Sequence, residues 1–381
     1  MPHADRRPLP EHLLAELDDA QCLAVADEDE AFAATAMLDI VDSLAPFSSE
    51  VQVRSAWLSQ VRSLLVILGD RCPDRLGVRM LAAISRTAFA ARETTAGLAA
   101  GEHALKRAIE TGDVAAQVSI RAGRLPFLAI SSPVEAAREA RLLDAATCQL
   151  QADGPPTFRD AEVLLAYLAW HGAAGALDAM RRELAALGRL RLPHDDALHF
   201  VAYASQASLA QFYLRSRQLA QAALALIEAA RLADQQGAHA ELANLQVVIA
   251  AIAMQAGDFP AAVAHAQSAV EAAAATPVQH AQPDPWLGFP IDICIIDSCA
   301  GAVQVLAESV LHAQDIGDAT GFLIAASAMG AFYLADDRAL EALDALTEAA
   351  EVAKSLDDGE VALVLRAQAE ALLSHLGILK G

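Results

Sequence analysis

Small residues recur along the C-terminal half of the chain at intervals of about forty positions. A second set stands seven positions after the first, and both sets hold alanine: Ala222, Ala262, Ala302 and Ala342, with Ala229, Ala269 and Ala349. Self-similarity at a period of roughly 20 to 50 residues is typical of stacked repeats. No unit of such an array buries its apolar face alone, and neighbouring units complete the core. The chain is therefore predicted to be a repeat protein.

The composition favours helices. Hydrophobic residues make up 55% of the chain and aromatic residues only 5%. Most of the apolar residues are Ala, Leu and Val, and alanine is the best helix former and lets helices approach closely. A chain of 381 residues exceeds one ordinary hydrophobic core. An all-α repeat array avoids this limit because its core grows along an axis.

The clearest unit spans residues 242–276. Apolar residues at helical spacing run through ELANLQVVIAAIAMQAG, GDFP forms the turn, and AAVAHAQSAVEAAAA is the second helix. Asp258 is expected to cap the second helix, and Pro260 lies in its first turn, where a missing N–H is tolerated. The unit is thus a predicted helix hairpin.

The small and turn residues of this hairpin are Ala250, Ala253, Gly257, Asp258, Phe259, Ala262 and Ala269, and their spacing resembles the tetratricopeptide repeat. Two further stretches fit the same frame, Leu209-Ala210-x-x-Tyr213 and Gly330-x-x-Tyr333, and the resemblance covers about 200–376. It implies a right-handed superhelical α-solenoid of stacked antiparallel helix hairpins. Segments such as LIEAARLADQQGAHAEL look like repeats of bacterial signalling regulators.

The unit expected at 282–316 departs from this frame. QPDPWLGFPIDICII carries three prolines and puts Pro290 where a small residue should lie at the helix crossing, whereas the second helix of the unit survives. The loop carries two aromatic residues, Trp286 and Phe289, and loops on rigid scaffolds often hold residues that bind a partner. It either contacts a partner through them or fills a gap between hairpins.

The N-terminal part has the same helical character with poorer motifs. We expect an N-terminal array at 1–151, a hinge at 152–157 and a C-terminal array at 158–381. Ser132-Pro133-Val134-Glu135 is a capping box that predicts a helix start. The expected helices are 11–25, 29–45, 49–69, 75–97, 98–111, 113–130, 133–151, 158–171 and 174–188.

The net charge of −22 is concentrated in the C-terminal half. Residues 1–217 hold 28 acids and 22 bases (net −6), and residues 218–381 hold 21 acids and 5 bases (net −16). This half would repel a phosphate backbone, so direct nucleic-acid binding is not expected. The charge either keeps the array soluble or attracts a basic partner. Part of it forms a stripe of four acidic residues: Glu341, Asp344, Glu348 and Glu351.

The chain lacks the motifs of common catalytic and metal sites. It contains no GxxxxGK[ST], GxGxxG after a strand, HExxH or GxSxG. Asp195 and His199 could share a helix face beside His194 and Asp196, but acids are also typical of a first helical turn. Five scattered cysteines form no CxxC pair and are interpreted as reduced thiols: Cys22, Cys72, Cys148, Cys294 and Cys299.

These observations predict a cytoplasmic protein without metal, cofactor or catalytic activity. The N-terminus has no signal-peptide h-region. The most apolar stretches are shorter than the ~20 residues that a membrane span needs. An enzyme with a metal site near 194–199 stays an open alternative, and metal analysis of the purified protein would test it.

In tetratricopeptide proteins the first helix of each hairpin lines a concave groove. Carried onto this sequence, the resemblance assigns peptide-binding positions to three helices: Gln211, Leu214 and Arg215; Asn244, Val247, Ala251, Met254 and Gln255; and Ile324 and Ser327. Asn244 is the only asparagine of the chain. Its amide could donate to and accept from a peptide backbone, or it could belong to a solvated polar face.

The predicted function is a non-catalytic scaffold or adaptor that binds a protein or peptide in this groove. The partner would be a basic or apolar segment, and a homodimer stays open. The alternative is the sensory repeat module of a bacterial signalling or transcription regulator, with its effector domain on another segment or chain.

Overall fold

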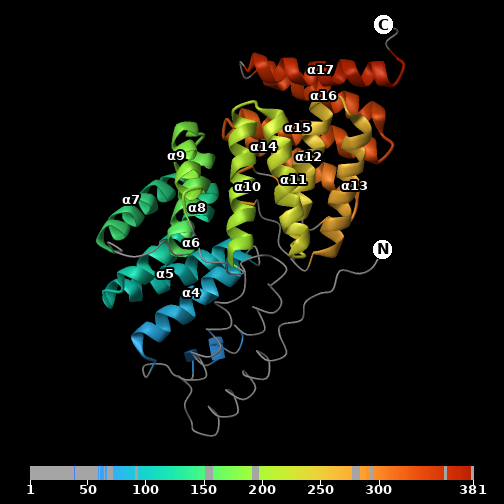
Figure 1. The fold of residues 1–381 in the computed structure, drawn as a ribbon. Coiled ribbons are helices and arrows are strands. Elements are labelled where there is room, and N and C mark those ends of the chain that lie inside the picture. Colours follow the sequence, from blue (N-terminus) through green and yellow to red (C-terminus); the bar gives the residue numbers. More distant parts are fainter. Residues whose placement is uncertain are drawn as a thin grey trace. The chain divides into compact units, whose positions relative to one another are not determined.

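The computed structural model describes residues 72–90, 93–150, 158–190, 197–276, 284–289, 296–355 and 358–378, together with the single positions 38, 59, 61–63, 65, 66, 291 and 293. Within these residues every regular element is an α-helix (Figure 1). The all-α prediction is therefore confirmed for the described part of the chain. The helices are α4 (Asp74–Ala90), α5 (Thr94–Glu110), α6 (Val114–Ser131), α7 (Pro133–Leu150), α8 (Phe158–Ala173), α9 (Leu177–Leu187), α10 (Ala197–Arg215), α11 (Leu219–Gln235), α12 (His239–Gln255), α13 (Phe259–Ala275), α14 (Cys299–Asp315), α15 (Ala319–Ala335), α16 (Ala339–Ser355) and α17 (Gly359–His375).

The forty-residue period arises from two helices of equal length. Each helix from α11 to α17 has 17 residues. Three-residue turns separate α10 from α11, α11 from α12, α12 from α13, α14 from α15 and α15 from α16. The middle residue of each has a positive φ, from Arg217 (57°) to Gly257 (72°). A residue in this left-handed conformation just after a helix ends it and reverses the chain.

The Gly-Asp turn shows how the sequence builds a hairpin. The N–H of Asp258 donates to the carbonyl of Ala253 at 2.9 Å, which closes the end of α12 as in a Schellman motif. The carboxylate of Asp258 then accepts from the N–H of Ala261 at 3.2 Å and caps α13. The predicted cap and the predicted place of Pro260 in the first turn are both confirmed.

The described residues of the third unit form no first helix, as the prolines predict. Residues 284–289, 291, 293 and 296 are not helical, and α14 supplies the second helix of the unit. Because one helix is missing, α12 packs directly against α15, which is the next first helix along the array. The hairpin frame of α12 with α13 and of α15 with α16 is retained.

The N-terminal helices form hairpins of the same kind, with two corrected boundaries, one of which is the start of α9 at Leu177 instead of 174. Helix α4 pairs with α5, and α6 pairs with α7, which begins at Pro133 as the capping box predicts. A single helix was expected over 75–97, but α4 ends at Ala90 and α5 begins at Thr94. The reason is tertiary: Gly97 packs against the ring of Phe89, and the hydroxyl of Ser85 donates to the Gly97 carbonyl at 2.7 Å.

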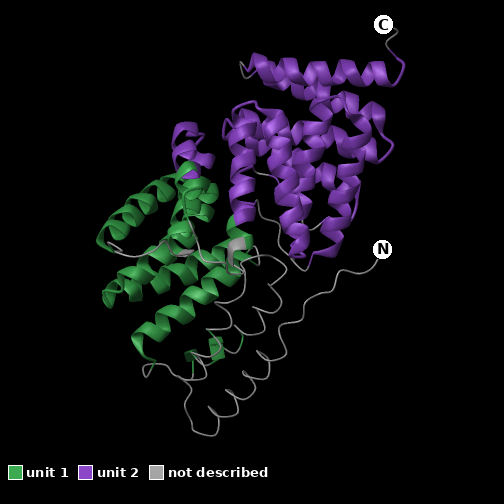
Figure 2. Ribbon diagram, in the orientation of Figure 1, with its two compact units in different colours: residues 1–170, 185–201 green, residues 171–184, 202–381 purple. Residues whose placement is uncertain are grey.

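The described contacts divide the chain into two compact units (Figure 2). Unit 1 comprises residues 1–170 and 185–201, and unit 2 comprises residues 171–184 and 202–381. The expected hinge at 152–157 and the expected helices 11–25, 29–45 and 49–69 fall outside the described residues, apart from the single positions named above. No described helix is both long enough and apolar enough to cross a membrane.

Candidate functional site

The groove residues predicted from the sequence recur at spacings of three and four along α10, α12 and α15, so each helix carries its set on one side. We call the three sets together the inner face, and it comprises Gln211, Leu214, Arg215, Asn244, Val247, Ala251, Met254, Gln255, Ile324 and Ser327. Arg215 and Gln255 are partly exposed, and the other members are buried. Asn244 is 0% exposed, so the interpretation of a solvated polar face is wrong for this residue.

The inner face is covered by the non-helical segment that replaces the missing helix. We call its described residues, 284–289, 291, 293 and 296, the strap. The N–H of Ile293 donates to the Asn244 side-chain oxygen at 3.0 Å. The carbonyl of Gly288 accepts from the Arg215 guanidinium at 3.3 Å and from the Gln211 amide at 3.5 Å. The inner face therefore binds the backbone of an irregular segment at two points.

Side chains of the strap add a charged and an aromatic contact. Asp284 is 1% exposed. One of its carboxylate oxygens accepts from the Tyr203 hydroxyl of α10, and the other accepts from the N–H of Trp286 at 2.8 Å. The Arg215 guanidinium lies 5.3 Å from the centre of the Phe289 ring, within the range of a cation–π interaction.

Gly288 permits the closest approach of the strap to the inner face. Its φ of +62° lies in the left-handed region, and a Cβ atom there would collide with the Gln211 amide. A second glycine, Gly172 of α8, borders the same amide from another side. The positive φ strains any residue with a side chain at position 288, and the Gln211 amide would also have to move to make room for a Cβ atom.

Arg215 joins the strap to the framework of unit 2. Its guanidinium forms a paired contact with Asp318, at 2.9 and 3.1 Å. The Asp318 carboxylate also caps α15 by accepting from the N–H of Gly321 at 3.0 Å. The two side chains are only 12% and 10% exposed. One residue thus holds both the strap and the start of the neighbouring first helix.

Several buried polar atoms near the inner face have no hydrogen-bond partner in the described part of the chain. They belong to helices α10, α12, α15 and α17: Ser208 Oγ, Gln211 Oε1, Arg215 Nε, Gln255 Nε2, Ser327 Oγ, and both amide atoms of Gln368. Buried polar groups are nearly always hydrogen-bonded. These helices therefore have the capacity to bind more polar groups than the strap supplies.

The two aromatic residues predicted as partner contacts lie within the strap. Phe289 is 2% exposed and Trp286 is half-buried. The strap thus fills the place of a helix within unit 2, as one of the two sequence-based interpretations expected. A contact of Trp286 or Phe289 with a partner stays a prediction. Sequence reasoning found both Asn244 and the irregular loop, but no signal indicated that the two meet.

Replacing Asn244 by alanine is expected to lower the free energy of unfolding by about 1–3 kcal/mol, because the buried N–H of Ile293 loses its partner. Urea denaturation of the full chain measures the change. The matched control is Gln246→Ala on the same helix, whose amide contacts His265 at 2.7 Å away from the strap. Equal stability of the Asn244 variant and the wild type would contradict the described contact.

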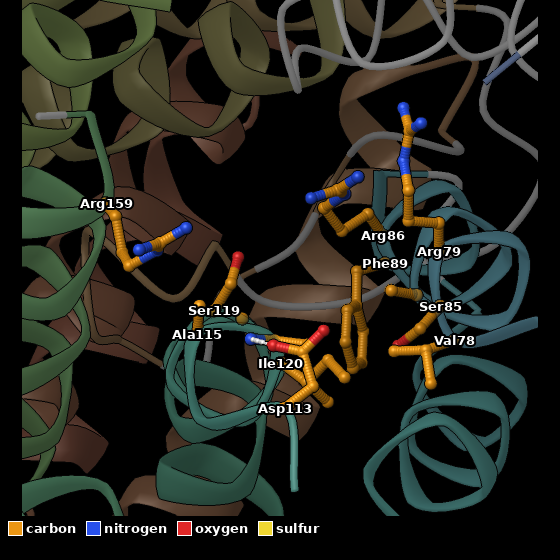
Figure 3. A pocket seen from close by; sticks show the side chains of 13 residues that line it. Val78, Arg79, Ser85, Arg86, Phe89, Asp113, Ala115, Ser119, Ile120 and Arg159 are labelled. Carbon is orange, nitrogen blue, oxygen red and sulfur yellow. Dashed lines mark hydrogen bonds between the residues drawn. The ribbon is translucent and has the colours of Figure 1, made fainter. Parts of the chain in front are cut away.

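Unit 1 contains a separate pocket of about 240 Å³ between α4, α6 and α8 (Figure 3). Three arginines surround it, Arg79, Arg86 and Arg159, and its apolar wall includes Phe89 and Ile120. Arg79 and Arg86 already take part in other interactions. No sequence motif indicated this pocket, because its residues come from helices far apart in the chain.

The structure does not assemble a metal site from described residues. No group of three or more His, Cys, Asp or Glu side chains that could hold a metal ion occurs among them. His199 is exposed, and His194, Asp195 and Asp196 lie outside the described residues, so the alternative near 194–199 stays untested. Cys72, Cys148 and Cys299 are free thiols. Burial raises the pKa of Cys72 and of Cys299.

No family model and no curated protein matches this chain. Among solved structures, the crystal structure of a Rap protein complexed with Competence and Sporulation Factor is similar to it. The two chains are 13% identical, with a TM-score of 0.46, and the match covers 97% of this chain and 99% of that chain.

Proposed function

We propose that the inner face of unit 2 binds an extended segment of a protein or peptide, and that the chain acts as a non-catalytic scaffold or adaptor. The observation that supports this most is the pair of backbone contacts to the strap, through Asn244 and through Arg215 with Gln211. An amide and a guanidinium that hold backbone atoms of one segment are chemically able to hold those of another. Apolar neighbours such as Val247 and Met254 would contact its side chains.

The same face would serve a sensory repeat module, in which ligand binding controls an effector domain on another segment or chain. The proposal also includes a cytoplasmic location, which the free thiols support. All four residues of the acidic stripe on α16 are exposed. However, Glu341 contacts Arg338 and Glu351 contacts Arg366. Ion pairs therefore offset half of the stripe that a basic partner would meet.

The experiment uses ten-residue peptides selected from a random display library on the full chain. Gln255→Ala should weaken the binding of the selected peptides about five- to tenfold, because a buried amide donor without a partner in the described structure would be satisfied by the ligand. Isothermal titration calorimetry measures the dissociation constants. Gln255 is preferred over Asn244 here because it has no described contact with the strap.

Gln246→Ala is the matched control, since it removes an amide from the same helix but away from the inner face. Its dissociation constants should equal those of the wild type. If no peptide is selected, or if the two variants bind the selected peptides equally well, the inner face is not the binding site.

A further inference from the structure

We infer that the strap is an intramolecular competitor of the ligand, and that the ligand resembles it: an extended segment with a carboxylate five residues before an aromatic ring. This inference rests on the proposed function. The strap shows the chemistry that the inner face and Tyr203 of α10 accept, namely the carboxylate of Asp284 beside Tyr203, the ring of Phe289 beneath Arg215, and backbone atoms at Gly288 and Ile293.

Competition follows from the way in which the strap occupies the face. It is tethered between α13 and α14, so its effective concentration at the inner face is of the order of millimolar. A ligand must displace it, and the apparent dissociation constant equals the intrinsic one divided by the fraction of molecules in which the strap is released.

A free ligand can nevertheless displace the strap, because the strap does not satisfy every polar atom of these helices. Ser208 and Gln255 each retain a buried polar atom without a partner in the described residues, as does Ser327. A segment that repeats the contacts of the strap and also satisfies these atoms would gain hydrogen bonds that the strap does not form. The strap therefore excludes segments that bind weakly and is displaced by a segment that forms these additional hydrogen bonds.

Gly288→Ala is the variant that tests this, because the substitution lies in the strap and replaces no residue of the inner face. A Cβ atom at this position would collide with the Gln211 amide, and the backbone there has a positive φ. The matched control is Gly257→Ala, whose φ is also positive, at +72°, but whose Cβ would have no atom within 4 Å. The control carries the same kind of backbone strain and leaves the strap in place.

The probe is a fluorescent synthetic peptide with the sequence of residues 284–293, DPWLGFPIDI. We expect it to bind the Gly288→Ala chain at least tenfold more tightly than it binds the wild type or the Gly257→Ala chain. Peptides with Asn in place of the Asp at 284, or Ala in place of the Phe at 289, should bind the Gly288→Ala chain at least fivefold more weakly than the parent peptide.

Asn244 provides a second and independent readout. In the wild type, Asn244 would bind the strap before the ligand arrives and the ligand afterwards. Its removal would weaken both contacts, so the apparent affinity should change by less than twofold. In the Gly288→Ala chain the strap no longer uses Asn244, and adding Asn244→Ala should weaken binding about tenfold. A merely structural role of Asn244 would not produce this difference between the two backgrounds.

Equal affinity of the probe for the folded wild-type and Gly288→Ala chains would overturn the inference, as would absence of binding to both. Circular dichroism establishes that each variant is folded, and Asp284→Asn replaces Gly288→Ala if the latter is not. Hydrogen exchange separates this inference from the proposed function. If a library peptide binds through Gln255 but leaves the exchange of the Ile293 N–H unchanged, the proposed function stands and competition by the strap is wrong.

Discussion

Replacing Arg215 by alanine is expected to lower the free energy of unfolding of unit 2 by about 3–5 kcal/mol, because the substitution leaves a buried carboxylate without its partner. Asp318 is 10% exposed and contacts both terminal nitrogens of Arg215. The loss also removes the cation above Phe289 and a donor to the Gly288 carbonyl. Both the contact of α10 with Asp318 and the attachment of the strap should therefore weaken. Urea denaturation of the full chain, followed by circular dichroism, measures the effect.

Two further variants sharpen this test. Arg215→Lys keeps the charge but cannot form the paired contact of a guanidinium, so its loss should lie between those of the wild type and the alanine variant. Arg231→Ala is the matched control, since its side chain is 50% exposed and pairs with Glu228 on the same helix surface. Exposed pairs of this kind contribute little to stability. A similar loss for Arg215→Ala and Arg231→Ala would show that the Asp318 contact does not stabilise the fold.

In unit 1, Glu139→Ala is expected to cost a comparable amount, about 3–5 kcal/mol, because one carboxylate serves two buried guanidiniums. Glu139 contacts Arg121 at 3.0 Å and Arg124 at 3.2 Å, and the three side chains are 8%, 6% and 12% exposed. Burial lowers the pKa of Arg121, while Glu139 acts in the opposite direction. Without the carboxylate, two like charges would remain close together with little water around them.

Thermal and urea unfolding of the full chain measure this change, and unit 1 should lose structure first. Glu102→Ala on α5 is the control, because Glu102 is exposed, and its replacement should leave unfolding nearly unchanged. Glu139→Gln should be less harmful than Glu139→Ala, since the amide oxygen still accepts from one arginine. If Glu139→Ala unfolds like the wild type, the two arginines must find other partners, and the described triad does not hold α6 to α7.

The features that could be predicted from the sequence are those that depend on neighbours a few residues apart. The cap of α13 by Asp258 links residues three positions apart, and the turn at Gly257 needs only a residue that tolerates a positive φ. The forty-residue spacing follows because these local rules repeat. The prolines around Trp286 exclude a helix for the same kind of reason, since proline lacks the N–H that a helix interior needs.

The state of the inner face depended instead on contacts between distant parts of the chain. Asn244 meets Ile293 across 49 positions, Arg215 meets Asp318 across 103, and Tyr203 meets Asp284 across 81. The sequence alone indicated polar and small residues for a groove, and it determined the helices and turns that carry them. Only the tertiary structure decided that the strap would cover that groove, because loop closure and burial depend on the packing of whole helices, whereas caps and turns depend on the local backbone.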